Sequence, residues 1–108
     1  MSELQPDITL LRPRADFYSS AHPGAADVLL LIEVADATLR LDGRVKIPLY
    51  ARSGIVEAWL LDLMTERVEV FREPSGGRYR ESARVARGSS LTPLAFPDLA
   101  LAVDELLG

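Results

Sequence analysis

The sequence predicts an α/β or α+β fold in which a mixed sheet is joined by one crossover helix. The first observation is a run of five apolar residues, Val28 to Ile32, which is typical of a strand buried on both faces. The second is the helical spacing of apolar residues over about 39–53, and the third is another apolar strand from Val56 to Leu61. A strand, a helix and a strand in this order indicate a right-handed crossover between parallel strands.

The chain of 108 residues has an ordinary globular composition, with 48% hydrophobic and 26% charged residues. This length supports one modest core, so we expect a single domain over 1–108. The sequence contains no cysteine, no stretch long enough to span a membrane and no signal-peptide pattern, which favours the cytoplasm and excludes a membrane protein. The formal net charge of −4 gives no general attraction to nucleic acid, so a polyanion would have to bind a local patch.

The first strand and the helix have recognisable boundaries. The segment "DITLL" (7–11) after Pro6 predicts a short strand, and residues 12–26 form a connection of low periodicity. The helix is expected to end before Gly54. Pro48 lies inside it, so we expect either a kink or a regular helix that begins only near Asp42.

The C-terminal half predicts a hairpin and a final helical turn. The segments "RVEVFRE" and "RYRESARVAR" are joined by the turn residues "PSGG" and alternate in polarity, as in an antiparallel hairpin. The tail "DLALAVDELLG" is expected to form a helical turn that packs Leu106 or Leu107 onto the core.

Charged residues interrupt this apolar pattern in the first half. Glu33 follows the buried run directly, and a carboxylate in that position is costly unless it is paired. We expect Asp7, at the start of the first strand, and Lys46, the only lysine, to lie near it. Two carboxylates with open positions for water suit Mg²⁺, and a nearby lysine can position a hydroxide and offset charge on a phosphoryl oxygen. The three residues therefore suit phosphodiester hydrolysis.

The ordered motifs Pro6-Asp7, "IEVAD" (32–36) and "DGRVKIPLYARSGIVEAWLLD" (42–62) resemble the Uma-type branch of the PD-(D/E)XK, restriction-endonuclease-like nucleases. The resemblance extends from about Pro6 to the C-terminus. It implies that Asp7, Glu33 and the backbone carbonyl of Val34 hold Mg²⁺, or Mn²⁺ as an alternative, and that the catalytic residues are Asp7, Glu33 and Lys46.

One position departs from the usual superfamily pattern. Most members carry the lysine two residues after the glutamate, where this chain has Ala35. The resemblance to the Uma-type branch implies that the lysine has moved to the following helix, at Lys46.

The resemblance also implies a fold and a function. The fold would be a restriction-endonuclease-like mixed sheet with one crossover helix and a C-terminal hairpin, and the function a Mg²⁺-dependent endonuclease acting on DNA. Family members carry a further helix and strand before the Pro-Asp strand, so we expect an N-terminally short member. The alternative is a catalytically weak or inactive relative that serves as a binding or assembly module.

The expected short N-terminus also bears on assembly. Without a preceding strand and helix, we expect a bare sheet edge and apolar side chains such as Leu10 and Leu30 facing water. Such surfaces favour association, so a homodimer or a larger even oligomer is expected, with an interface that involves the first two strands.

Each site residue also has a structural alternative. Asp7 could be a turn or cap residue after proline, and Glu33 could pair with an arginine. Lys46 could pair with Asp42, one helical turn earlier. Only the joint pattern of the three residues favours a catalytic site.

Other conspicuous residues are expected to lie outside the site. Tyr50 is expected to pack on the helix with its hydroxyl at the surface, and Trp59 to lie in the core. His22 has no second metal ligand at a suitable spacing and is expected to face solvent in a loop. The second Pro-Asp pair, Pro97-Asp98, is not followed by a strand pattern that would direct it at Glu33.

Arginines on the last predicted strand are a further candidate. Arg78, Arg80 and Arg84 follow a period of two, so they are expected to share one face and could contact phosphates. The glutamates of the neighbouring strand are expected to neutralise them in a solvated salt-bridge face; these are Glu66, Glu69 and Glu73.

Overall fold

A computed structural model of the chain describes residues 6–16, 23–36 and 40–108, with side chains from 44 onward in the last range. The main feature is a five-stranded sheet in the order β1-β2-β3-β4-β5. Its strands are β1 (Ile8–Leu11), β2 (Val28–Ala35), β3 (Glu57–Asp62), β4 (Arg67–Ser75) and β5 (Arg78–Ala86).

The pairing of these strands makes the sheet mixed. β2 and β3 are parallel and are connected by helix α1 (Arg40–Arg52), whereas β1–β2, β3–β4 and β4–β5 are antiparallel. The predicted α+β arrangement, with one crossover helix between parallel strands and a hairpin after them, is therefore confirmed. A 3-10 turn, η1 (Ala25–Asp27), leads directly into β2.

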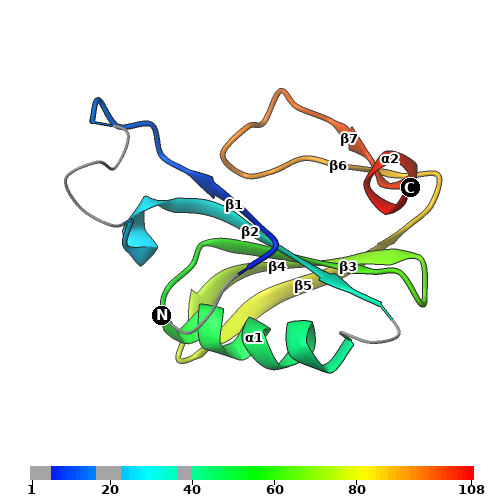
Figure 1. The fold of residues 1–108 in the computed structure, drawn as a ribbon, viewed down its shortest axis with the longest axis horizontal. Coiled ribbons are helices and arrows are strands. Elements are labelled where there is room, and N and C mark those ends of the chain that lie inside the picture. Colours follow the sequence, from blue (N-terminus) through cyan, green and yellow to red (C-terminus); the bar gives the residue numbers. More distant parts are fainter. Residues whose placement is uncertain (1–5, 17–22, 37–39) are drawn as a thin grey trace.

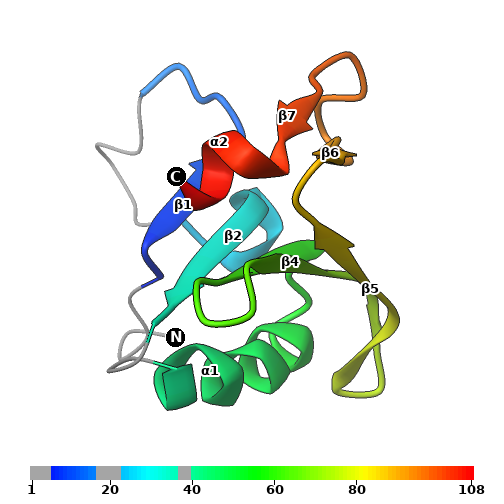
Figure 2. The same cartoon turned by 90° about the vertical axis from the view of Figure 1, so that its right-hand side faces the viewer.

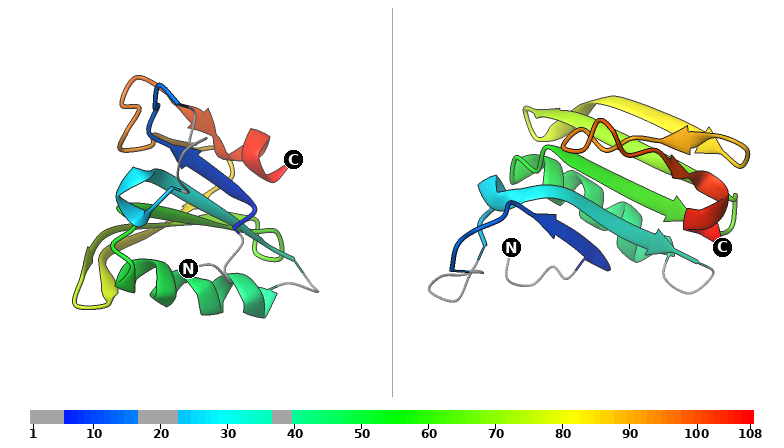
Figure 3. Two further views of the ribbon diagram at one scale, coloured as in Figure 1. Left: turned by 60° about the vertical axis from the view of Figure 1, so that its left-hand side comes forward. Right: turned by 90° about the horizontal axis from the view of Figure 1, so that it is seen from above.

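The two faces of the sheet are covered by different parts of the chain. Figure 1 shows α1 below the sheet and the C-terminal segment above it. That segment contains the short strands β6 (Ser90–Leu91) and β7 (Leu101–Ala102) and helix α2 (Val103–Leu107). Figure 2 shows the same three layers from the side, and the view from above in Figure 3 shows β2, β3 and β4 side by side over α1.

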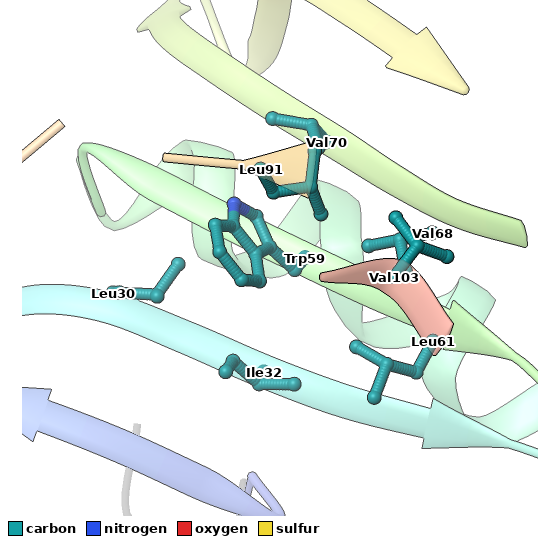
Figure 4. Close-up of a cluster of buried hydrophobic side chains, with 8 residues drawn as sticks. All are labelled: Leu30, Ile32, Trp59, Leu61, Val68, Val70, Leu91 and Val103. Atoms are coloured by element: carbon teal, nitrogen blue, oxygen red, sulfur yellow. The ribbon is translucent and has the colours of Figure 1, made fainter. Parts of the chain in front are cut away.

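The larger apolar cluster lies between the sheet and the C-terminal segment. Trp59 is at its centre and has no exposed surface, as predicted (Figure 4). Val103 of α2 is also completely buried, and Leu106 and Leu107 pack against the cluster, in agreement with the expected final helical turn. The remaining buried members are Leu30, Ile32, Leu61, Val68, Val70 and Leu91.

This covered face corrects one prediction. Leu30 is 1% exposed, and Leu10 is partly buried against the same cluster, so the expectation that both side chains face water is wrong. The reason is that the C-terminal segment covers this face of the sheet and both side chains join the cluster beneath it, which local sequence patterns did not indicate.

Helix α1 begins at Arg40 and continues through Pro48, so the alternative of a start near Asp42 is wrong. Pro48 removes the N–H that would bond to the Arg44 carbonyl, yet the helix retains its later turns. It ends at Arg52, before Gly54 as predicted, and Gly54 has φ +79°. The N–H of Ile55 donates to the Tyr50 carbonyl and that of Gly54 to the Ala51 carbonyl, each at 3.1 Å, which is the Schellman pattern of a helix end.

The β4–β5 hairpin is closed by two glycines with positive φ, Gly76 at 61° and Gly77 at 83°, as a two-residue turn requires. Near this turn the side chains no longer alternate regularly between the two faces of the sheet, because Glu73 of β4 has φ 58°. Ser82 lies opposite Phe71, and the ring of Tyr79 also packs against Phe71 with the ring centroids 5.9 Å apart. Residues three apart on β5 therefore share one face.

This break overturns the predicted arginine stripe, because Arg78 and Arg84 lie on either side of it and cannot share a face by a strict period of two. The expected neutralisation is also wrong. Glu66 pairs with Arg87 at 2.8 Å and Glu69 pairs with Arg44 of α1 at 2.9 Å, rather than with arginines of the stripe.

No helix in the described ranges is long and apolar enough to cross a lipid bilayer.

Candidate functional site

The candidate site lies on the α1 face of the sheet, near the carboxyl end of β2. Leu30, Ile32 and Val34 point into the cluster below the C-terminal segment. Because side chains alternate between the two faces of a strand, Glu33 points to the opposite face, toward α1. Ile8 is paired with Ile32 across the antiparallel β1–β2 ladder. Continuing this register places Asp7 opposite Glu33, and directly opposed residues project on the same face of a sheet.

Asp7 lies at the exposed start of β1 and is tied to β2. Its Oδ2 atom accepts a hydrogen bond from the backbone N–H of Val34 at 2.7 Å. In an extended strand the N–H and carbonyl of one residue point to the same side, so the Val34 carbonyl also points toward the β1 edge. The Asp7 carboxylate and the Val34 carbonyl thus lie beside Glu33 where β1 and β2 meet, a place that we call the acidic corner.

The Glu33 carboxylate is 2% exposed and is held by two residues of α1. The Tyr50 hydroxyl donates a hydrogen bond of 2.5 Å to Oε1 of Glu33. The Lys46 Nζ atom lies 3.5 Å from the same oxygen. Both contacts are therefore made to Oε1, while the described residues provide no hydrogen-bond donor to Oε2.

Burial is the largest influence on the pKa of Glu33, and it raises that pKa. The Tyr50 hydrogen bond and the Lys46 charge lower it, and the charge of Asp7 raises it, with the sum above the ordinary value of 4.5. The strand register places Asp7 opposite Glu33, so the two carboxylates are close enough to repel each other. A divalent cation between them would supply the missing positive charge, so this donor set fits a hard cation.

Lys46 is nearly buried, with 12% of its side chain exposed, and it forms an ion pair with Glu33. The alternative partner Asp42 has a side chain outside the described part of the structure. The other alternative, in which Glu33 pairs with an arginine, is not what the structure shows, because the cation beside Glu33 is Lys46.

Tyr50 is the residue that sequence reasoning placed incorrectly. Its side chain has no exposed surface and its hydroxyl reaches Glu33, so the prediction of a surface hydroxyl is wrong. The available signal was its spacing: Tyr50 lies four residues after Lys46, and residues with this spacing lie on the same side of a helix.

A second charged group lies beside this site on the same face. Arg44 of α1 bridges two carboxylates, with Nη2 at 2.7 Å from Oδ2 of Asp62 and Nη1 at 2.9 Å from Oε1 of Glu69. Burial raises the pKa of Asp62, but the N–H groups of Thr65 and Met64 and the charge of Arg44 lower it overall. Asp62 is therefore held in its ionised form.

The remaining candidates do not join the site. His22 lies outside the described residues. Asp98 is exposed on the segment between β6 and β7, which belongs to the layer on the opposite face of the sheet. Among the described side chains, those of 6–16, 23–36 and 44–108, no group of three or more His, Cys, Asp or Glu residues could hold a metal ion. The donors at hand are two carboxylates and a carbonyl, and Mg²⁺ commonly binds so few protein ligands together with water.

Glu33→Gln is expected to leave the free energy of unfolding unchanged or to raise it at neutral pH. The raised pKa means that the folded state disfavours ionised Glu33. This loss of stability is absent below the ordinary value of 4.5 and develops as the pH rises through the folded-state pKa. The gain from Glu33→Gln should therefore be present at neutral pH and vanish in acid. Urea unfolding over a pH series measures it, and a gain confined to acid would contradict the assignment.

The comparisons with known proteins agree with this architecture. The Uma2 family model, described as "Putative restriction endonuclease", matches residues 1–104. No curated protein matches the chain. The match covers the mixed sheet, its crossover helix and nearly all of the C-terminal segment. The chain therefore belongs to the Uma2 family of restriction-endonuclease-like proteins.

Proposed function

We propose that the protein is a Mg²⁺-dependent endonuclease that hydrolyses DNA phosphodiester bonds. Asp7, Glu33 and the carbonyl of Val34 would hold the metal, and Lys46 would orient the attacking water. The observation that supports this most directly is the convergence of Asp7 and Lys46 on the buried Glu33 carboxylate. Membership of a family described as "Putative restriction endonuclease" makes DNA the expected substrate.

The arrangement of donors around Glu33 suits this role. When bound, Mg²⁺ would supply Lewis acidity toward the phosphate and lower the pKa of its water. Tyr50 and Lys46 both contact Oε1, so they fix the carboxylate while its other oxygen is left for the metal. The ammonium group of Lys46 lies at the same point and can hold a water and offset negative charge on a phosphoryl oxygen.

Tyr50 acts in this proposal as a positioning residue. Its hydroxyl donates to Glu33 and so fixes the carboxylate that would hold the metal. A buried carboxylate oriented by a second residue retains one geometry, and metal ligands are commonly held in this way.

A second function, as a catalytically weak binding or assembly module, is favoured by a different observation. Asp7 already accepts the Val34 N–H, and Glu33 already has a hydroxyl and an ammonium partner, so the corner is stabilised by its own contacts. Such a corner could be kept for stability alone. Metal binding and DNA cleavage separate the two functions.

Metal binding is expected to depend on both carboxylates. Glu33→Gln and Asp7→Asn should each abolish measurable binding of Mg²⁺ or Mn²⁺ in calorimetry, because each removes a charged ligand. Asp98→Asn is the matched control, since it alters the other Pro-Asp pair and should bind as the wild type does. Equal binding by the wild type and Glu33→Gln would show that Glu33 is not a ligand.

DNA cleavage is expected to depend on the charge of Lys46. Lys46→Met keeps the length of the side chain, and it should lower the rate of plasmid cleavage by about 10²-fold while metal affinity stays close to that of the wild type. Arg52→Met removes one positive charge from the last turn of the same helix and is the control. A wild-type protein that binds Mn²⁺ but cleaves no DNA would contradict the endonuclease and support the assembly module.

We also propose a homodimer or a larger even oligomer through the first two strands. β1 has β2 as its strand neighbour, and no other described strand pairs with its outer edge. Ile8 on this edge is 48% exposed. A free edge with an exposed apolar residue favours pairing with a second copy.

Light scattering behind a sizing column tests this assembly. We expect the wild type to elute as a dimer or larger even oligomer at micromolar concentration and Ile8→Lys to elute as a monomer, because a charge on β1 blocks edge pairing. Val45→Lys is the control, since Val45 is 63% exposed on α1 and lies away from the edge. A monomeric wild type with well-protected β1 amides would contradict the dimer.

A further inference from the structure

We propose that a second site beside the metal centre binds a backbone phosphate of the DNA on which the protein acts. The site is a hollow of about 150 Å³ on the α1 face, which we call the arginine pocket. This inference rests on the proposed function, since it supplies that function with a contact to the substrate. The residues lining the pocket are Arg44, Asp62, Thr65, Arg67, Glu69 and Arg84.

Strand register brings these residues together from three strands. Asp62 at the end of β3 lies opposite Arg67 at the start of β4, and Glu69 of β4 lies opposite Arg84 of β5. Arg44 reaches the same place from α1. The pocket therefore gathers three arginines and two carboxylates at one end of the sheet.

The carboxylates of the pocket are already occupied. Arg44 takes both of them, at 2.7 Å from Asp62 and 2.9 Å from Glu69. Asp62 also accepts the backbone N–H groups of Met64 and Thr65. The side chains of Asp62 and Glu69 are only 7% and 13% exposed, so these contacts cover both carboxylates. They are not arranged to bind further cations.

Arg67 and Arg84 lie opposite carboxylates but form no ion pair with them. Each faces a carboxylate across a strand pair, where opposite charges normally interact. Within the described residues, however, neither makes a side-chain hydrogen bond or an ion pair, because Arg44 has taken the facing carboxylates. Both are exposed and line the hollow. The pocket therefore has two uncommitted guanidinium groups and an excess of positive charge.

Phosphate is the ligand chemistry that fits such a pocket. The planar fork of arginine matches the oxygens of a phosphate, and two forks can hold one phosphate from two sides. The net charge of −4 repels a polyanion elsewhere, so binding needs a local positive site of this kind.

The pocket lies at a suitable place relative to Glu33. Glu33 is in register with Leu60, Leu60 with Glu69, and Glu69 with Arg84, so these positions form one row across the sheet. Strands lie about 4.8 Å apart, which separates Glu33 from the pocket by roughly 10 to 15 Å. Successive phosphates of one strand rise about 3.4 Å along the axis of a duplex, so this separation spans only a few nucleotides, and the ligand we infer is a phosphate of the polynucleotide backbone near the scissile bond.

The test compares two double variants with the same change of charge. Arg67→Gln/Arg84→Gln removes the uncommitted arginines of the pocket. Arg78→Gln/Arg80→Gln removes two exposed arginines at the other end of β5, next to the hairpin turn. Binding of a fluorescein-labelled short DNA duplex is measured by anisotropy in Ca²⁺ over a range of salt concentrations, and thermal unfolding confirms that each variant is folded.

We expect the pocket variant to bind the duplex about tenfold more weakly and to lower the slope of log affinity against log salt by about 1, with little change in the control. Equal effects in both variants, or none in the pocket variant, would overturn the inference while the proposed function stood. Displacement of the duplex by equimolar inorganic phosphate would show a site for free phosphate instead. A wild type that does not bind the duplex also overturns the inference, and Mn²⁺ calorimetry then reports separately on the metal site.

Discussion

The burial of one carboxylate, Glu33, is the constraint on which the α1 face of this protein depends. A buried charge is costly unless donors are brought to it, and here both described donors come from α1. Lys46 and Tyr50 lie one helical turn apart and reach the same oxygen, so they fix how far along β2 the helix lies and which side it turns to the sheet. Asp7 adds a second negative charge at this corner, and the remaining imbalance is what makes it suitable for a cation.

Helix α1 distributes positive charge over the whole face. Lys46 forms an ion pair with the carboxylate of β2, whereas Arg44 forms ion pairs with the carboxylates of β3 and β4. Its reach leaves an acidic corner at β1 and β2 and a basic pocket at β4 and β5 on the same side of the sheet. The proposed endonuclease would use both, the first to hold its metal and the second to bind a phosphate of the DNA. The separation of negative and positive charge on one face would therefore provide both parts of the proposed site.

The other buried carboxylate, Glu57, shows what a structural role looks like in the same fold. It has no exposed surface, and its two oxygens accept from three donors: Trp59, Arg72 and the backbone N–H of Leu94. These bonds tie β3 to β4 and to the C-terminal segment that covers the apolar cluster. Both oxygens of Glu57 are used, whereas the described donors to Glu33 all use Oε1. This difference separates a carboxylate that holds the fold from one that could bind a ligand.

The sequence by itself determined the elements whose pattern depends on near neighbours: the apolar run of β2, the helix that ends before Gly54, and the hairpin with its two glycines. It also made Asp7, Glu33 and Lys46 the candidates for a site, because their residue types and order are distinctive. Only the tertiary structure decided that Tyr50 turns inward, that Leu30 is buried in the cluster under the C-terminal segment and that Asp62 pairs with Arg44 rather than with Arg67. These outcomes depend on the rotation of a helix over a sheet and on the return of the C-terminal segment. Both are set by packing between residues distant in the chain, which local periodicity does not encode.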